Sequence, residues 1–206
     1  MIFEGEYLNG QKNGKGKEYY FTGNLKYDGE YLNGKKWNGK GYNINGNIEY
    51  EINNGNGKIK EYFSDCSRLR FEGEYINGEI NGKGKEYNYD GELEFEGEYL
   101  DGTKWNGKGK EYSFNILIYE GEYLNGERNG KGKEYYYGNI IFEGEYSKGK
   151  RYKGKEYVHG ELVFEGNYIN EKRNIGKLYS NGKLLFEGKI LGRHKYKWKE
   201  FNKFSK

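Results

Sequence analysis

The 206-residue sequence has no proline, one cysteine and two histidines. A single cysteine excludes an internal disulfide framework and both common zinc patterns, and it favours a reducing compartment. Cys66 has no histidine nearby, His159 falls at a turn position and His194 lies in a basic stretch. None of the three forms the pair that nucleophilic catalysis needs. Without proline, and with glycines at fixed positions, the chain does not resemble a flexible linker.

Long apolar runs and a strong excess of charge are also missing. No apolar stretch approaches the length of a membrane span, and residues 1–5 enter a repeat directly, so we expect no signal peptide. The 35 basic and 32 acidic residues give a net charge of +3. This near balance argues against a nucleic-acid partner. We expect a cytoplasmic protein, and peripheral attachment to a membrane is the alternative.

Aromatic residues separate this chain from disordered sequences of similar polarity. Charged residues make up 33% of the chain and hydrophobic residues only 33%, whereas 24 Tyr, 11 Phe and 3 Trp raise the aromatic share to 18%. Each ring buries a large area, so a few rings per repeat can hold a sheet together without a thick aliphatic core.

The motif Phe-Glu-Gly-Glu-Tyr-Leu-Asp-Gly at residues 95–102 returns throughout the chain. Copies follow one another at intervals of 21 to 24 residues, which is typical of a repeat architecture. We therefore predict one domain over residues 1–206, made of nine repeats. The repeats begin near Phe3, Tyr27, Tyr50, Phe71, Phe95, Tyr119, Phe142, Phe164 and Phe186.

Each repeat has the pattern of a β-hairpin. In the copy that starts at Tyr119, residues alternate with period two and are interrupted by Asn-Gly and Gly-Asn pairs, which are turn signals. No stretch shows a helical period. The predicted fold is all-β, an elongated single-layer antiparallel sheet of stacked β-hairpins.

The alternation also predicts which side chains share a face. Phe142, Gly144 and Tyr146 should lie on one face, with a neighbouring ring lying across the glycine. Tyr157 should join this face, which leaves an acidic, solvated face opposite. The apolar residue two positions before each motif aromatic is expected on the aromatic face as well; these residues are Leu25, Ile48, Leu69, Leu93, Leu117, Ile140, Leu162 and Leu184.

The face that carries the lysines depends on strand register. Without a bulge, Lys131 and Lys133 lie on the aromatic face with their stems over the rings. A bulge at residues 130–132 moves them to the face of Glu143 and Glu145, where they form cross-strand ion pairs. The sequence leaves both alternatives open.

Three places depart from the regular pattern. Residues 1–8 have no preceding strand, so we expect an exposed sheet edge there unless a partner or a second copy covers it. The repeat at Tyr50 is degenerate, which predicts an imperfect ladder. Residues 193–206 are basic and aromatic, and we interpret them as a capping strand or tail.

The pattern resembles the membrane occupation and recognition nexus (MORN) repeat, in the variant form found in many bacterial and protist proteins. The unit Y-x-G-x-W/Y-x-x-G-x-x-x-G-x-G is matched by Tyr119, Gly121, Tyr123, Gly126, Gly130 and Gly132. Tyr stands where the commonest form has Trp, and the next aromatic falls one residue later than usual. The resemblance implies an elongated sheet that serves as a scaffold, a protein-binding surface or a dimerisation module.

The sequence offers little support for an enzyme, a cofactor site or a metal site. The Gly-Lys-Gly-Lys runs lack the spacing and the following helix of a phosphate-binding loop. The pair Glu143 and Glu145 recurs in most repeats, whereas acid–base chemistry needs one pair in unlike environments. No repeat collects three oxygen ligands in a calcium-type loop. We predict no catalytic residues, no metal, no cofactor and no small-molecule substrate.

Aromatic residues next to basic ones form the main candidate binding surface. Three repeats carry such a pair in the loop between the paired glycines, and the aromatic members are Trp37, Trp105 and Tyr152. Pairs of this kind suit a protein hot spot or a membrane interface. Alternatively, each ring folds back over its own hairpin. On the aromatic face itself, the candidate partner-binding residues are Tyr99, Tyr123 and Tyr146.

The basic C-terminal stretch is a second candidate surface. It suits an anionic lipid or an acidic protein, and its candidate residues are Arg193, Lys195, Lys197, Trp198 and Lys199. A cap over the last apolar edge explains the same residues without a ligand. We predict a non-enzymatic scaffold for protein binding or self-association, with binding to anionic membranes as the alternative.

Overall fold

Two-residue turns with left-handed backbone conformations close the hairpins. Asn125 and Gly126 have φ angles of 55° and 77°, and Asn33 and Gly34 have angles of 50° and 82°. Positive φ at both central positions is the type I′ geometry, whose twist matches that of the flanking strands. Asparagine and glycine adopt it at little cost, so the recurrent Asn-Gly pairs set the hairpins.

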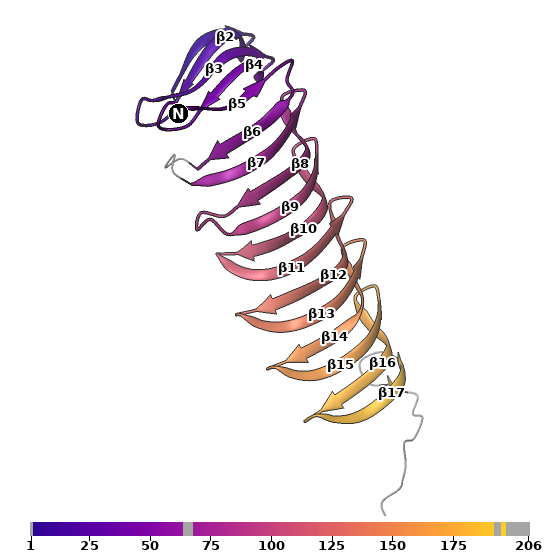
Figure 1. Cartoon of the computed structure of the whole chain (residues 1–206). Coiled ribbons are helices and arrows are strands. Elements are labelled where there is room, and N and C mark those ends of the chain that lie inside the picture. The colour runs from indigo at the N-terminus through magenta and orange to yellow at the C-terminus, as the bar shows by residue number, and fades with distance from the viewer. Residues whose placement is uncertain (1, 64–67, 192–194, 197–206) are drawn as a thin grey trace, which may run out of the picture. The chain divides into compact units, whose positions relative to one another are not determined.

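The computed structural model describes residues 2–63, 68–191 and 195–196, and it divides into two units, Met1–Gly107 and Lys108–Lys206. Every regular element in these described residues is a β-strand (Figure 1). The first unit contains β1 (Ile2–Leu8), β2 (Gln11–Tyr19), β3 (Leu25–Leu32), β4 (Lys35–Tyr42), β5 (Ile48–Ile52), β6 (Gly57–Tyr62), β7 (Leu69–Ile76), β8 (Glu79–Tyr87) and β9 (Leu93–Leu100). Strand β10 (Thr103–Ser113) spans the boundary between the units.

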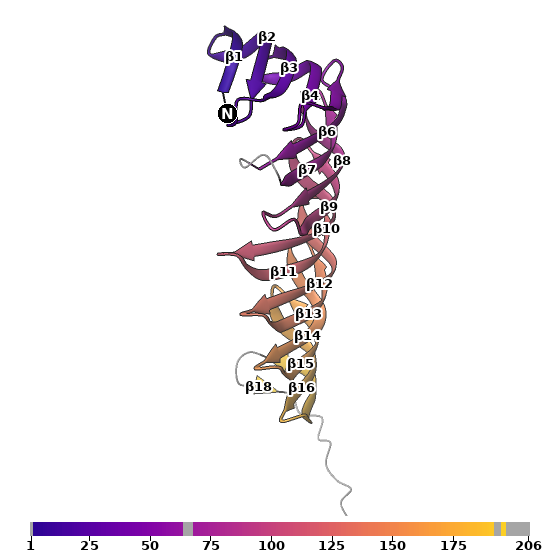
Figure 2. The same ribbon diagram turned by 60° about the vertical axis from the view of Figure 1, so that its left-hand side comes forward.

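The second unit continues the same pattern. It contains β11 (Ile116–Leu124), β12 (Glu127–Tyr136), β13 (Asn139–Ser147), β14 (Lys150–Val158), β15 (Glu161–Ile169), β16 (Lys172–Ser180), β17 (Lys183–Leu191) and β18 (Lys195–Tyr196). In each unit, neighbouring strands in the sequence are neighbours in space, and their ladders are antiparallel (Figure 2). The sheets are open stacks of hairpins, as the sequence predicts.

Paired glycines fix the register of the strands. Gly144 lies opposite Gly132 on one side and opposite Gly154 on the other. A Cβ built on Gly154 would come within 2.6 Å of Cζ of Phe142, because that ring lies over the glycine pair. The prediction that rings cover the glycines is therefore confirmed.

The motif aromatics form the core on one face, which we call the inner face. Phe142 is fully buried and meets Tyr146 of its own strand edge to face, with ring centroids 5.5 Å apart. It meets Tyr168 of the next repeat at the same distance. Edge-to-face contacts of this kind favour a fixed ring geometry. The core is thus a chain of rings that passes from repeat to repeat.

Bulges place some residues on the face opposite to the one predicted. Glu156 lies directly opposite Phe142, so the next residue, Tyr157, points to the outer face and hydrogen-bonds to Glu143. Ile140 pairs with Tyr135 after a register shift, which places it on the outer face as well. The predictions that put Tyr157 and Ile140 with the inner aromatics are wrong, because each bulge moves the following residues by one position.

The lysines of the second strand of each hairpin lie on the outer face. Lys131 is opposite Glu145, and Lys133 is opposite Glu143. A register shift between Gly121 and Tyr123 produces this arrangement, so the bulge alternative is the correct one. The outer face is therefore a mixture of Lys and Glu, not the acidic surface that the sequence predicted.

The degenerate third repeat interrupts the ladder, as predicted. Ile52 and Ile59 stand where other repeats have the paired glycines, and both side chains are buried. Their bulk prevents the close backbone approach that glycines allow. The hydrogen-bonded strand order accordingly ends at β5 and starts again at β6.

The described part of the chain contains no helix with the length and apolarity that crossing a bilayer requires.

Candidate functional site

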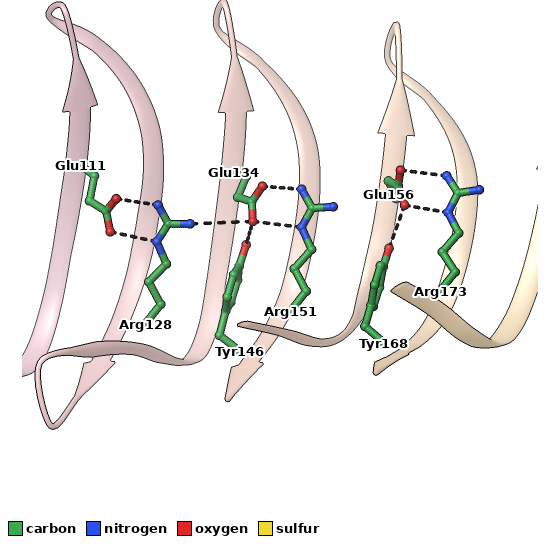
Figure 3. Close-up of polar contacts among 8 residues, drawn as sticks. All are labelled: Glu111, Arg128, Glu134, Tyr146, Arg151, Glu156, Tyr168 and Arg173. Carbon is green, nitrogen blue, oxygen red and sulfur yellow. Dashed lines mark hydrogen bonds and ion pairs between the residues drawn. The ribbon is translucent and has the colours of Figure 1, made fainter. Parts of the chain in front are cut away.

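A ladder of charged side chains covers the inner aromatic rings in the second unit. Each Arg comes from the start of the second strand of a hairpin, and each Glu comes from the end of the second strand of the preceding hairpin. Figure 3 shows how they interlock. The members are Glu111 and Arg128, Glu134 and Arg151, and Glu156 and Arg173.

The ion pairs of this ladder are bidentate. Nε of Arg173 donates to Oε2 of Glu156 at 2.9 Å, and its Nη2 donates to Oε1 at 2.8 Å. Arg151 holds Glu134 in the same way, through Nε at 3.0 Å and also through Nη2. Two parallel hydrogen bonds fix the plane of each guanidinium as well as its position. The charged groups are thus held in place before any partner arrives.

The charged ladder lies over the aromatic rings of the inner face and is joined to them by hydrogen bonds and cation–π contacts. Tyr146 donates a 2.7 Å hydrogen bond to Glu134, and Tyr168 donates one of 3.0 Å to Glu156. Each guanidinium also lies over a motif ring, where a cation is attracted to the π-face. The distances from Cζ to the ring centroid are 4.0 Å for Arg128 over Tyr119, 4.5 Å for Arg151 over Phe142 and 5.3 Å for Arg173 over Phe164.

The electrostatics of the ladder keep its carboxylates ionised. Burial by itself would raise the pKa of Glu134, but the hydrogen bonds from Arg151 and Tyr146 outweigh this effect and lower it. Burial and the bond to Glu134 both raise the pKa of Tyr146, so its hydroxyl stays protonated. At neutral pH the ladder therefore presents fixed carboxylates and guanidiniums.

The first unit has lysines at the corresponding positions. Glu18 is only 5% exposed, and its carboxylate forms ion pairs with Nζ of Lys12 at 2.6 Å and with Nζ of Lys36 at 3.2 Å. Burial opposes ionisation, yet the two ammonium groups lower the pKa of Glu18 to about 2. These ammonium groups also lie over rings, at 4.3 Å from the centroid of Phe3 for Lys12 and 4.6 Å from that of Tyr27 for Lys36.

The outer face carries an open groove of about 540 Å³ across β6 to β9. The backbones of Gly73, Gly84 and Gly97 form its floor, and rows of Lys and Glu form its walls. Among these residues Lys85 pairs with Glu96 at 3.1 Å. Because Lys and Glu alternate from strand to strand, the groove has no strong preference for an anion or a cation.

The basic–aromatic pairs predicted in loops lie within strands. Lys36 is opposite Tyr31 and Asn38 is opposite Glu30, so Trp37 is the extra residue of a bulge in β4. Its Cζ3 would lie 2.8 Å from a Cβ built on Gly55, and the N–H of Gly55 donates to its carbonyl. Trp37 thus packs on the turn of the following hairpin, not over its own.

The other two members of this set occupy similar bulges. Asn106 donates to Glu98 at 2.9 Å, as Asn38 does to Glu30, which puts Trp105 in the position of Trp37. Tyr152 is the bulge residue of β14 and is 54% exposed. Of the three aromatics, Tyr152 offers the most accessible ring.

The predicted residues of the aromatic face belong to the core. Tyr99 and Tyr146 are 5% and 3% exposed, and Tyr123 is half-buried and donates to Glu111 at 2.7 Å. The structure brings Tyr123 and Tyr146 into one cluster with Tyr119. A partner-binding role for the three predicted tyrosines remains a prediction.

The predicted basic surface is described only in part. Lys195 lies in β18, where it pairs with Leu191 of β17. Arg193, Lys197, Trp198 and Lys199 lie outside the described residues, as do Cys66 and His194. The predicted tail site therefore remains a prediction from sequence.

The sequence interpretation missed the ladder. Its signal was a fixed spacing, since Glu and Arg stand 17 residues apart in all three pairs. Such a spacing becomes meaningful only once the register is known, because the register decides which Arg and which Glu lie next to each other across the sheet.

The comparison with protein families agrees with this architecture. A family model for the MORN repeat matches residues 3–25, 71–92 and 119–139, and each match covers one predicted hairpin and its turn. No curated protein matches the chain. MORN repeats generally serve interaction with proteins or membranes as a repeat scaffold. The chain therefore contains MORN repeats at these three segments.

Proposed function

We propose that this protein is a non-enzymatic scaffold that binds another protein, or a second copy of itself, along the border of the inner face in residues 108–190. The observation that carries the proposal is the exposed ring of Tyr152 next to Arg151, whose guanidinium the ladder holds in place. Aromatic and Arg side chains together dominate the energetics of protein interfaces.

Rigidity supports this assignment. Tyr152 lies in a strand, and its neighbour Arg151 is fixed by two hydrogen bonds to Glu134 and by the ring of Phe142. Because these side chains are already fixed, the scaffold loses little conformational freedom when a partner docks, and this lowers the entropic cost of binding.

The charge state of the ladder supports a binding role over a catalytic one. Glu134 and Glu156 both have lowered pKa values, in each case because an Arg and a Tyr outweigh the effect of burial. A general acid at neutral pH needs a raised pKa, and a catalytic pair needs two unlike environments. Carboxylates in similar environments, repeated along a sheet, suit a partner that contacts several successive repeats.

A capture experiment with matched variants tests the proposal. Immobilised protein is exposed to native extract, and Tyr152→Ala is compared with Tyr137→Ala. Tyr137 is a good control because its ring is 71% exposed but lies in the turn between β12 and β13. We expect a specific partner to be lost with Tyr152→Ala and retained with Tyr137→Ala. Equal retention by both variants would contradict the assignment.

A second assay tests the alternative that the protein binds to membranes. Binding to anionic membranes through Arg193, Lys195, Lys197, Trp198 and Lys199 is supported by sequence alone. Co-sedimentation with phosphatidylserine-containing vesicles at low salt, unaffected by Tyr152→Ala, would favour it over the protein-binding proposal. Absence of co-sedimentation would remove it. A cytoplasmic location, expected from the single cysteine, belongs to the same proposal.

A further inference from the structure

The first strand of the first repeat lies at the end of a sheet. Strand β1 carries the motif Phe-Glu-Gly-Glu-Tyr-Leu, as β9 does, with Phe3, Gly5 and Tyr7 on the inner face. Among the described residues, β2 is the only strand that pairs with it, since the sheet order runs from β1 to β5. Strand β13 has almost the same sequence, Phe-Glu-Gly-Glu-Tyr at residues 142–146, but is paired on both sides.

Strand β12 pairs with β13 on the side that corresponds to the unpaired side of β1, so it shows which residues fit there. Gly132 lies opposite Gly144, and Glu134 lies opposite Phe142. On the outer face, Lys131 and Lys133 lie opposite the two glutamates of the motif. Strand β14 covers β15 in the same register of glycine, Lys and Glu. The complement of a motif strand is therefore an antiparallel Gly-Lys-Gly-Lys-Glu-Tyr segment or a close relative.

The contacts made by that complement are missing at β1. Tyr146 is 3% exposed, since it packs against Tyr119 of the preceding repeat and donates to Glu134 of the covering strand, whereas the equivalent Tyr7 is 60% exposed. The basic residue of the repeat also changes its partner. Arg151 reaches back to the covering strand, but the equivalent Lys12 binds Glu18 of its own hairpin. Strand β1 thus has the shape and groups of an interior motif strand, and the described residues supply only one of its two neighbours.

Charge decides which kind of strand fits this edge. Two copies of β1 paired antiparallel about Gly5 would place Glu4 of each copy opposite Glu6 of the other. Like charges directly opposite destabilise a strand pair, whereas Lys opposite Glu stabilises it. An incoming segment with Lys on both sides of its second glycine meets Glu4 and Glu6 favourably, as Lys131 and Lys133 meet Glu145 and Glu143.

We propose that β1 is a strand-acceptor site that takes an extended Gly-Lys-Gly-Lys-Glu-Tyr segment from another polypeptide by antiparallel β-addition. Main-chain hydrogen bonds provide the affinity in this mode, and alternate side chains provide specificity. The glutamate of the segment lies opposite Phe3, where it accepts from Tyr7. The glycines approach Gly5 closely. The site is separate from the surface around Tyr152 and does not depend on the function proposed for it.

Peptide binding to the full chain tests the inference. The probe is a labelled heptapeptide with the sequence of residues 130–136, Gly-Lys-Gly-Lys-Glu-Tyr-Tyr. The control peptide, Gly-Glu-Gly-Glu-Glu-Tyr-Tyr, replaces both lysines. We expect the first peptide to bind about tenfold more tightly, since two cross-strand ion pairs are exchanged for two repulsions. Equal affinity for both peptides, or no binding of either, would overturn the proposal.

A charge exchange locates the site. The double variant Glu4→Lys with Glu6→Lys should prefer the control peptide, which a general loss of stability cannot produce. Tyr7→Phe should weaken binding of the first peptide severalfold while the circular dichroism spectrum stays unchanged. Amide exchange should slow at residues 2–8 when the first peptide is added. Protection at another strand, or an unchanged preference of the double variant, would contradict the assignment to β1.

Discussion

The hydroxyl of Tyr146 donates a 2.7 Å hydrogen bond to Glu134, a residue of the preceding repeat. The same link joins Tyr168 to Glu156. Because an Arg also binds the same Glu, the repeats that start at Tyr119, Phe142 and Phe164 each contact the preceding repeat through both a neutral and a charged donor. Stability in repeat proteins is approximately a sum of units and nearest-neighbour interfaces. In this chain the interface includes a polar network on top of the aromatic rings.

The first prediction concerns the ion pair between Arg151 and Glu134. Arg151→Met keeps the aliphatic stem over Phe142 but removes the charge, so we expect the free energy of unfolding to fall by about 1–3 kcal/mol. Denaturant titration measures this change. A double-mutant cycle with Glu134→Gln should show coupling above about 0.5 kcal/mol. A cycle between Arg173→Met and Glu134→Gln, whose residues belong to two different ion pairs, is the control and should be additive.

The second prediction concerns a buried hydroxyl in the first unit. Tyr27 is fully buried, and no described group hydrogen-bonds to its hydroxyl, whereas six other repeats have Phe at this motif position. Removing an unsatisfied buried polar group relieves its desolvation cost. We expect Tyr27→Phe to raise the free energy of unfolding by about 1 kcal/mol. The matched change Tyr146→Phe should lower it, because that hydroxyl is bonded. Destabilisation by both variants would show that Tyr27 has a partner.

The third prediction separates two roles of glycine. A Cβ on Gly154 would lie 2.4 Å from the carbonyl oxygen of Glu143 and 2.6 Å from the ring of Phe142. Gly160 has open space around it, but its φ angle is +80°. We expect Gly154→Ala to cost more than about 3 kcal/mol in unfolding free energy through overpacking, and Gly160→Ala about 1–2 kcal/mol through backbone strain. Similar thermal shifts for both variants would contradict the close approach at Gly154.

The fourth prediction concerns acid stability. The pKa of Glu18 falls from 4.5 to about 2 on folding, because Lys36 and Lys12 outweigh its burial. A lowered pKa means that the unfolded chain binds the proton more tightly. The contribution of Glu18 is therefore fully present above pH 4.5 and is lost as the pH falls toward 2. We expect a loss of about 3 kcal/mol across this window from this group.

The control for this acid effect is Glu18→Gln. Its unfolding free energy should be lower at pH 7 and should change less between pH 4.5 and pH 2, so that the two proteins converge in acid. Denaturant titration at a series of pH values measures both curves. Parallel curves for the two proteins would mean that the lysines do not stabilise the ionised form of Glu18.

The hairpins, their turns and the glycine-backed rings were predictable because each depends on a local pattern. Asn125-Gly126 signals a tight turn wherever it occurs, and the period of the motif counts the hairpins. The irregular ladder of the third repeat was equally visible, since Ile52 stands where a small residue is needed. These features require no knowledge of what lies across the sheet.

The faces and the charged ladder were not predictable in this way. A bulge shifts the register by one residue, and a one-residue shift turns every following side chain to the other face. This is why Tyr157 lies with Glu143 on the outer face and why Glu134 hydrogen-bonds to Arg151 over the inner rings. Composition and spacing are enough for a stack of hairpins. Which charges meet across it depends on where each bulge falls, and that is decided by the packing of rings and glycines between neighbouring strands.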